Sequence, residues 1–205
     1  MEDWTASWEA LGFPKFKEAS LQKIEITGKK LLVEAGVEEE EAALEVRLLL
    51  QESFSLNTAS YLLRKQEPLC KAGIEQTEIL QKLHSFYENF EKRRRRIPLA
   101  QILGRQSFYG LDFFVNEDVL IPRADTECLV DLVLEDYAEL AKQAGKTYAE
   151  KRILDLCTGS GCIGISVAKH LPYQELLLVD LSEKALVIAK KNAEEAGVAD
   201  QIHFK

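Results

Sequence analysis

The chain has 205 residues, a length that suits one large domain or two small ones. Hydrophobic residues make up 46% of it, which excludes wholesale disorder, and no apolar run is long enough to span a membrane. The formal net charge is −8, and residues 107–205 hold 17 acidic and 10 basic residues, an unfavourable balance for sequence-specific nucleic-acid binding. Glu2 and Asp3 stand where a signal peptide needs positive charge, so we expect a cytoplasmic protein with no membrane association.

Residues 1–105 are predicted to form a helical domain. Apolar side chains recur there at helical spacing, and no strand pattern interrupts them. Pro98 is expected to stop the last helix. The helices are expected over residues 27–35, 38–54, 58–65 and 77–96.

The string "EKRRRRIP" at residues 91–98 places four arginines at the end of the last of these helices. A solvated helix C-terminus explains them, because cations there face the negative end of the helix dipole. The alternative is a docking surface for an acidic or RNA-containing partner.

The four cysteines form no CxxC pair, and with only three scattered histidines they suggest no metal site. We expect reduced thiols that serve as small apolar residues. They are Cys70, Cys128, Cys157 and Cys162.

A β-hairpin linker is expected over residues 106–122, where aromatic and β-branched residues flank Gly110 and Asp112. Asp125 or Thr126 is then expected to cap a helix.

From Arg152 onward, strands and helices alternate, and this order predicts a parallel α/β sheet. The strands read "RILDL", "ELLLVD" and "QIHFK". Their nearly continuous apolar runs are typical of strands that are buried on both faces.

A glycine-rich loop follows the first of these strands. Gly159, Gly161 and Gly164 match the pattern G-x-G-x-x-G, and Asp180 follows about twenty residues later at the end of the next strand. This arrangement indicates a nucleotide-type cofactor. A carboxylate at Asp180 can accept hydrogen bonds from both ribose hydroxyls, and it would repel the 2′-phosphate of NADP.

Asp155 lies just before the same loop and bears on the kind of cofactor. A carboxylate there would weaken the attraction between the helix N-terminus and the pyrophosphate of NAD. S-adenosylmethionine carries a sulfonium and an ammonium group instead, and both favour a nearby carboxylate. The loop is therefore predicted to bind an adenosine that bears positive charge.

Two stretches resemble a known family. "ILDLCTGSGCIGISVA" and "VDLSEKALVIAKKNA" resemble the first two motifs of class I S-adenosylmethionine-dependent methyltransferases, which have a Rossmann-like parallel sheet. The segment "PLAQILGRQSFYGLDFFVNEDVLIPRADTECLV" resembles the linker of the HemK/PrmC family, the glutamine methyltransferases of peptide chain release factors. The resemblance is strong over residues 98–205.

The resemblance implies a set of site residues. Asp155 would lie beside the methionine part of S-adenosyl-L-methionine, Asp180 would hold the ribose, and residues 123–205 would form a partial cofactor-binding domain. The cavity for substrate and cofactor would be lined by Phe108, Arg123 and Thr126. The loop residues expected to contact the cofactor are Cys157, Thr158, Gly159, Ser160 and Gly161. The family usually has glycine at the position of Cys157.

The resemblance also implies what the 205 residues lack. The Asn-Pro-Pro-Tyr turn that holds the glutamine amide in the family has no match here. We therefore expect a C-terminally truncated and inactive chain with no catalytic residue of its own. Its parent would act on a release factor through a helical substrate-recognition domain at residues 1–105, and would be a monomer.

Three alternatives stay open. A methyltransferase acting on nucleic-acid bases would share both cofactor motifs, and an NAD-dependent oxidoreductase would share the glycine pattern. A non-enzymatic helical interaction module is the third.

Overall fold

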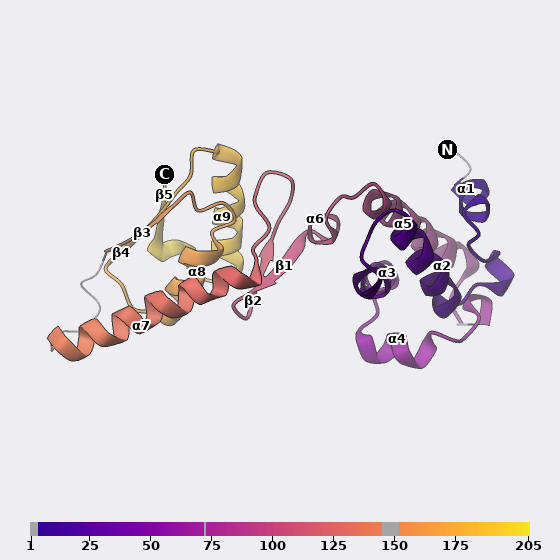
Figure 1. Ribbon diagram of the computed structural model, residues 1–205, viewed down its shortest axis with the longest axis horizontal. Helices are drawn as coiled ribbons and strands as arrows, with labels where there is room; N and C mark the ends of the chain where they lie inside the picture. The colour runs from indigo at the N-terminus through magenta and orange to yellow at the C-terminus, as the bar shows by residue number, and fades with distance from the viewer. Residues whose placement is uncertain (1–3, 72, 145–151) are drawn as a thin grey trace. The chain divides into compact units, whose positions relative to one another are not determined.

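The computed structural model describes residues 4–71, 73–144 and 152–205. It divides into two compact units, Met1–Leu103 and Gly104–Lys205 (Figure 1). The hairpin that we expected as a separate linker belongs to the second unit. None of the described helices combines the length and the apolar character needed to cross a bilayer.

The first unit is helical, as predicted, but it contains more helices than the periodicity suggested. α2 begins at Leu21 rather than near Thr27, because the Ser20 side chain accepts a hydrogen bond from the backbone N–H of Lys23 and caps the helix (3.3 Å). Pro98 separates two helices rather than ending the last one. The elements are α1 (Trp4–Ala10), η1 (Phe16–Glu18), α2 (Leu21–Glu34), α3 (Glu39–Phe54), α4 (Thr58–Arg64), η2 (Leu69–Lys71), α5 (Gln76–Arg94) and α6 (Leu99–Leu103).

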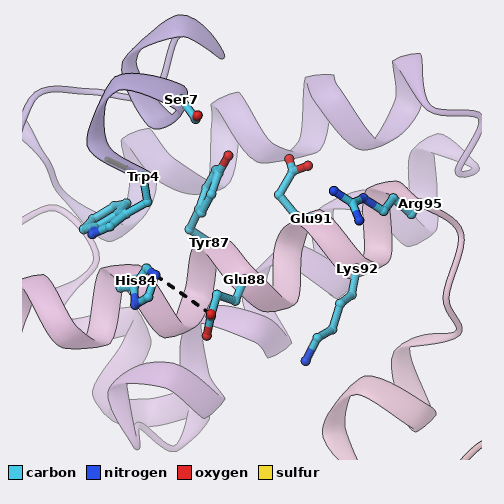
Figure 2. A pocket seen from close by; sticks show the side chains of 8 residues that line it. All are labelled: Trp4, Ser7, His84, Tyr87, Glu88, Glu91, Lys92 and Arg95. Atoms are coloured by element: carbon cyan, nitrogen blue, oxygen red, sulfur yellow. Dashed lines mark ion pairs between the residues drawn. The ribbon is translucent and has the colours of Figure 1, made fainter. Parts of the chain in front are cut away.

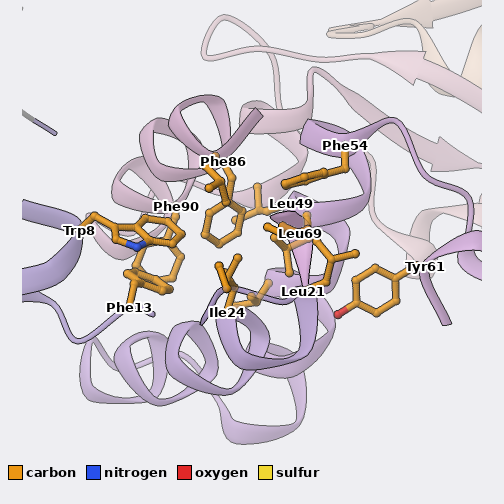
Figure 3. Close-up of a cluster of buried hydrophobic side chains, with 14 of the residues drawn as sticks. Trp8, Phe13, Leu21, Ile24, Leu49, Phe54, Tyr61, Leu69, Phe86 and Phe90 are labelled. Carbon is orange, nitrogen blue, oxygen red and sulfur yellow. The ribbon is translucent and has the colours of Figure 1, made fainter. Parts of the chain in front are cut away.

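Aromatic rings fill the core of this unit (Figure 3). Trp8 stacks on Phe13 with ring centroids 4.2 Å apart, and Phe13 meets Phe90 edge-on at 5.3 Å. Phe86 and Phe90 come from one face of α5 and are fully buried. Aromatic side chains bury large apolar areas, so this cluster supplies much of the unit's stability.

The arginine run is not a wholly solvated helix end, and that expectation is wrong for Arg93. Its side chain is 10% exposed and donates to Glu45 on α3 at 2.8 Å. Arg96 lies in the left-handed region, with φ of 70°, and its guanidinium donates to the carbonyl of Gly36. Two of the four arginines therefore fasten helices of this unit to one another.

An isolated chain of residues 1–103 is expected to fold. The core that surrounds Trp8 and Phe86 draws only on residues of this unit, and local helix packing needs no distant strand. Circular dichroism should show a helical spectrum and a cooperative thermal transition. A disordered spectrum would contradict this prediction.

The second unit carries the parallel sheet, which confirms the predicted α/β fold class. The strand order is β3-β4-β5, with Leu154 opposite Leu177 and Leu177 opposite His203. The elements are β1 (Arg105–Phe108), β2 (Leu111–Phe114), η3 (Ala124–Thr126), α7 (Glu127–Ala144), β3 (Arg152–Leu156), α8 (Cys162–His170), β4 (Glu175–Val179), α9 (Glu183–Glu195), η5 (Ala199–Gln201) and β5 (Ile202–Phe204).

The two faces of the sheet differ in burial. Leu176 and Leu178 are fully buried in the core that includes residues of α8 and α9. Leu154 and Leu156 point to the other face and are 60% and 67% exposed. The expectation that the strands are buried on both faces therefore holds for one face only.

The hairpin forms around Tyr109 and Gly110, whose φ angles of 50° and 74° are those of a type I′ turn. Phe108 and Phe113 lie on its buried face with ring centroids 6.0 Å apart. Both belong to the same core as Val130 of α7. The hairpin is thus packed into the α/β unit.

Candidate functional site

The glycine-rich loop connects the end of β3 to the start of α8. Its backbone turns through the left-handed region at Gly159 and Gly161, with φ of 55° and 80°. A Cβ atom added at Gly161 would lie 2.8 Å from Cδ1 of Ile165 and 3.2 Å from Cβ of Ala189. Close packing against α8 and α9 therefore requires glycine at this position.

Asp155 turns its half-buried side chain toward this loop. Its Oδ2 accepts hydrogen bonds from the Thr158 hydroxyl (2.7 Å) and from the backbone N–H of Gly164 (3.0 Å). Burial raises the pKa of Asp155, these two hydrogen bonds oppose the rise, and the negative charge of Asp180 adds to it. A cation beside Asp155 would relieve that unfavourable charge.

Asp180 follows β4 and holds the other side of the loop. Its Oδ2 accepts from the backbone N–H of Gly159 (2.8 Å), and its Oδ1 accepts from the N–H of Ser182 (2.9 Å). A carboxylate has about four acceptor positions, so each oxygen can still accept one more hydrogen bond. Among the described residues, neither Asp155 nor Asp180 forms an ion pair with a cationic side chain.

The structure therefore brings together most of the residues predicted from the sequence. Asp155, the loop from Cys157 to Gly161, and Asp180 meet where β3 and β4 end, which is where open α/β sheets bind their ligands. The site is anionic: two carboxylates accept hydrogen bonds from the backbone N–H groups that lie between them.

Cys157 adopts a conformation that suits glycine better. Its φ is 62°, in the left-handed region, and its side chain is exposed. This conformation is about 1–2 kcal/mol less favourable for a residue with a Cβ atom than the right-handed one. This backbone conformation explains why the family usually has glycine at the position of Cys157.

Replacing Cys157 with glycine is expected to raise the free energy of unfolding by about 0.5–1 kcal/mol, because the relieved strain exceeds the added entropy of the unfolded chain. Urea unfolding measures the change. Cys157→Ala is the matched control: alanine keeps a Cβ atom, so no gain is expected. An equal gain in both variants would contradict a backbone origin.

The three residues expected to line the cavity lie in different settings. The ring of Phe108 is 1% exposed and belongs to the core, so the structure places it away from any surface. Arg123 is exposed and precedes η3, and its carbonyl accepts from the N–H of Thr126 (2.9 Å). The hairpin turn is fastened nearby, where the N–H of Tyr109 donates to Glu127 (2.8 Å).

Sequence reasoning missed Asn192. This side chain is 2% exposed and bonds to the glycine-rich loop through the carbonyl of Ser160 (2.8 Å). The sequence holds one indication: Asn192 stands at helical spacing with Ala185 and Ala189, on the face of α9 that carries its buried alanines. A polar residue on such a face must find partners inside the protein.

The helical unit has a separate hollow of about 640 Å³ between α1 and α5 (Figure 2). The Trp4 ring lies against those of His84 and Tyr87, at 5.3 and 6.0 Å between centroids. Arg95 lines its other part. This hollow contains none of the predicted site residues.

Comparison with known proteins gives the site its context. The model of the methyltransferase small domain matches residues 137–205, which include the glycine-rich loop and both carboxylates. A release factor glutamine methyltransferase of Bacillus subtilis is 35% identical over 166 residues, covering 81% of this chain and 52% of its own length. One from Flavobacterium psychrophilum is 45% identical over 96 residues, covering 47% of this chain and 32% of its own.

The chain belongs to the HemK/PrmC family. A bifunctional methyltransferase of Rickettsia typhi is also 36% identical over 171 residues, 78% of this chain and 31% of its own. This HemK/PrmC chain thus spans about a third to a half of the length of the curated relatives it matches. The family is one of S-adenosylmethionine-dependent methyltransferases, whose cationic cofactor agrees with the two carboxylates around the loop.

Proposed function

We propose that the α/β unit binds S-adenosyl-L-methionine over the loop from Cys157 to Gly161. The observation that carries the proposal is the pair of carboxylates, Asp155 and Asp180, which flank the loop without a cationic partner among the described residues. Asp180 would accept from the ribose hydroxyls and Asp155 would face the charged methionine part. NAD would instead bring its pyrophosphate toward these two negative charges.

The proposed substrate is a glutamine side chain of a peptide chain release factor, because relatives with that name match 71% and 81% of this chain. The bound cofactor would supply a methyl group on a positively charged sulfur. An amide nitrogen is a poor nucleophile, so holding it in line with the methyl group and excluding water would account for most of the rate gain. The helical unit, Met1–Leu103, would help to recognise the release factor.

These 205 residues would bind the cofactor without transferring its methyl group. The family's Asn-Pro-Pro-Tyr turn is not in the sequence, so nothing among these residues would orient the amide. Without that orientation the reaction loses a lowering of the activation barrier that reaches ~7–11 kcal/mol in well-oriented intramolecular reactions.

Two measurements test the proposal. Calorimetry with S-adenosylmethionine and with NAD should detect binding of the first and not of the second; the reverse result would overturn the cofactor assignment. Transfer of a labelled methyl group to a release factor should be absent with this chain and present with the Bacillus subtilis relative. Turnover by this chain would place the chemistry within residues 1–205.

The affinity for S-adenosylmethionine is expected to depend on pH through Asp155. Its pKa is raised in the folded protein, so lowering the pH through that value removes the charge and weakens binding of the cation. Stability should change in the opposite direction: the contribution of Asp155 is present at acid pH and is lost as the pH rises through its folded pKa. Calorimetry and urea unfolding are measured at pH values below and above the folded pKa of Asp155. The affinity trend and the stability trend should both appear in the wild type and be absent from Asp155→Asn, the control.

A further inference from the structure

Asn192 joins two segments that lie far from it in the sequence. Its Oδ1 accepts from the backbone N–H of Phe114 (2.7 Å), and its Nδ2 donates to the carbonyl of Phe114 (3.1 Å) and to that of Ser160 (2.8 Å). One buried side chain thus bonds to both backbone groups of a hairpin residue and to the glycine-rich loop.

The chemistry of these three contacts requires a primary amide. Phe114 offers one donor and one acceptor, and Ser160 offers a second acceptor, so the side chain must accept once and donate twice. Aspartate could accept from Phe114 but at neutral pH could not donate to either carbonyl. Asn192 and Ser160 are each 2% exposed, so an unmet polar group on either residue would be unfavourable.

The same face of α9 touches the loop at a second point. Ala189 lies one turn before Asn192 and packs where a side chain on Gly161 would be, 3.2 Å from an added Cβ. Helix α9 therefore supports two successive residues of the loop, Ser160 by a hydrogen bond and Gly161 by contact. Asn192 then extends that support to β2.

We propose that Asn192 is a positioning residue that holds the cofactor loop in its binding conformation by tying Ser160 to the hairpin. The proposal rests on the proposed binding of S-adenosylmethionine over this loop. Ser160 lies between Gly159, which donates to Asp180, and Gly161, the N-cap of α8. Release of the Ser160 carbonyl would leave this peptide held only through the N–H of Gly161, which donates to the carbonyl of Thr158 (2.8 Å). The loosened turn includes Gly159, whose N–H holds Asp180.

The test separates loop position from general stability. Asn192→Ser and Asn192→Asp are compared with Val198→Ala, a control in the same core that removes buried methyl groups and leaves the three hydrogen bonds intact. Calorimetry at a temperature where each variant is folded should show a dissociation constant for S-adenosylmethionine raised about tenfold in both Asn192 variants, which is ~1.4 kcal/mol. Val198→Ala should stay within about twofold.

A second readout needs no cofactor. Amide hydrogen exchange at Gly159 and Gly161 should be faster in the Asn192 variants than global unfolding explains, and should follow global unfolding in Val198→Ala. At acid pH, protonated aspartate regains one donor, so the defect of Asn192→Asp relative to wild type should shrink. Unchanged affinity, or an equal loss in the Val198 control, would overturn the proposal.

The two proposals can fail separately. If wild type does not bind S-adenosylmethionine, the proposed function fails, and exchange at Gly159 and Gly161 still decides whether Asn192 holds the loop. If wild type binds and the exchange of these amides is the same in every variant, the role of Asn192 is refuted and the cofactor assignment remains.

Discussion

Replacement of Asp180 with alanine is expected to lower the affinity for S-adenosylmethionine by at least about tenfold. The variant removes the charged acceptor that we propose for two ribose hydroxyls, and a hydrogen bond to a charged group contributes ~1.5–3 kcal/mol. It also leaves the N–H of Gly159 without the acceptor that now holds it at 2.8 Å. The first loss acts on the proposed ribose contact and the second on the glycine-rich loop, and both lower the affinity.

Calorimetry measures this change, and Asp200→Ala is the matched control. Asp200 is an exposed acid in η5, so its removal alters the net charge equally without touching the loop. An equal drop in affinity for both variants would indicate that long-range charge, rather than direct contact, explains the effect. Unchanged affinity in Asp180→Ala would remove Asp180 from the cofactor site.

The local arrangement around the loop could be predicted because its causes are local in the sequence. Strand, glycine turn and helix follow one another directly, and Ser182, a residue type favoured at helix starts, caps α9 through the N–H of Ala185 (3.3 Å). Parallel neighbours then bring the ends of β3 and β4 together. The meeting of Asp155 and Asp180 at one edge follows from this topology alone.

Contacts between distant segments could not be read in the same way. Arg93 looks like one of four solvated cations until α3 places Glu45 beside it at 2.8 Å. The family resemblance implied that Phe108 lines a cavity, and the sequence of a two-stranded hairpin does not say which of its faces will be covered. The structure covers that face with the core shared by Val130 and Ile165. Burial in each case is decided by a partner far along the chain.

Gly164→Ala is expected to destabilise the protein by about 2 kcal/mol, although alanine favours a helix by ~1 kcal/mol over glycine. An added Cβ would lie 2.9 Å from Oδ2 of Asp155 and 2.9 Å from Cδ1 of Leu178. The Asp155 side chain cannot move away without losing the hydrogen bond that it accepts from the N–H of Gly164 (3.0 Å). The affinity for S-adenosylmethionine should fall in the same variant, because the displaced carboxylate is the one proposed to face the cofactor's charge.

Urea unfolding shows whether Gly164→Ala lowers or raises the free energy of unfolding. Ser166→Ala, on the same helix, is the control variant. Ser166 is fully buried, and its hydroxyl has no hydrogen-bond partner among the described residues, so alanine there raises helix propensity and adds no atom. That variant should be as stable as wild type or more so. If Gly164→Ala were also stabilising, helix propensity alone would govern this position. Asp155 would then have room to move, and a tight contact between β3 and the first turn of α8 could not be what orients it.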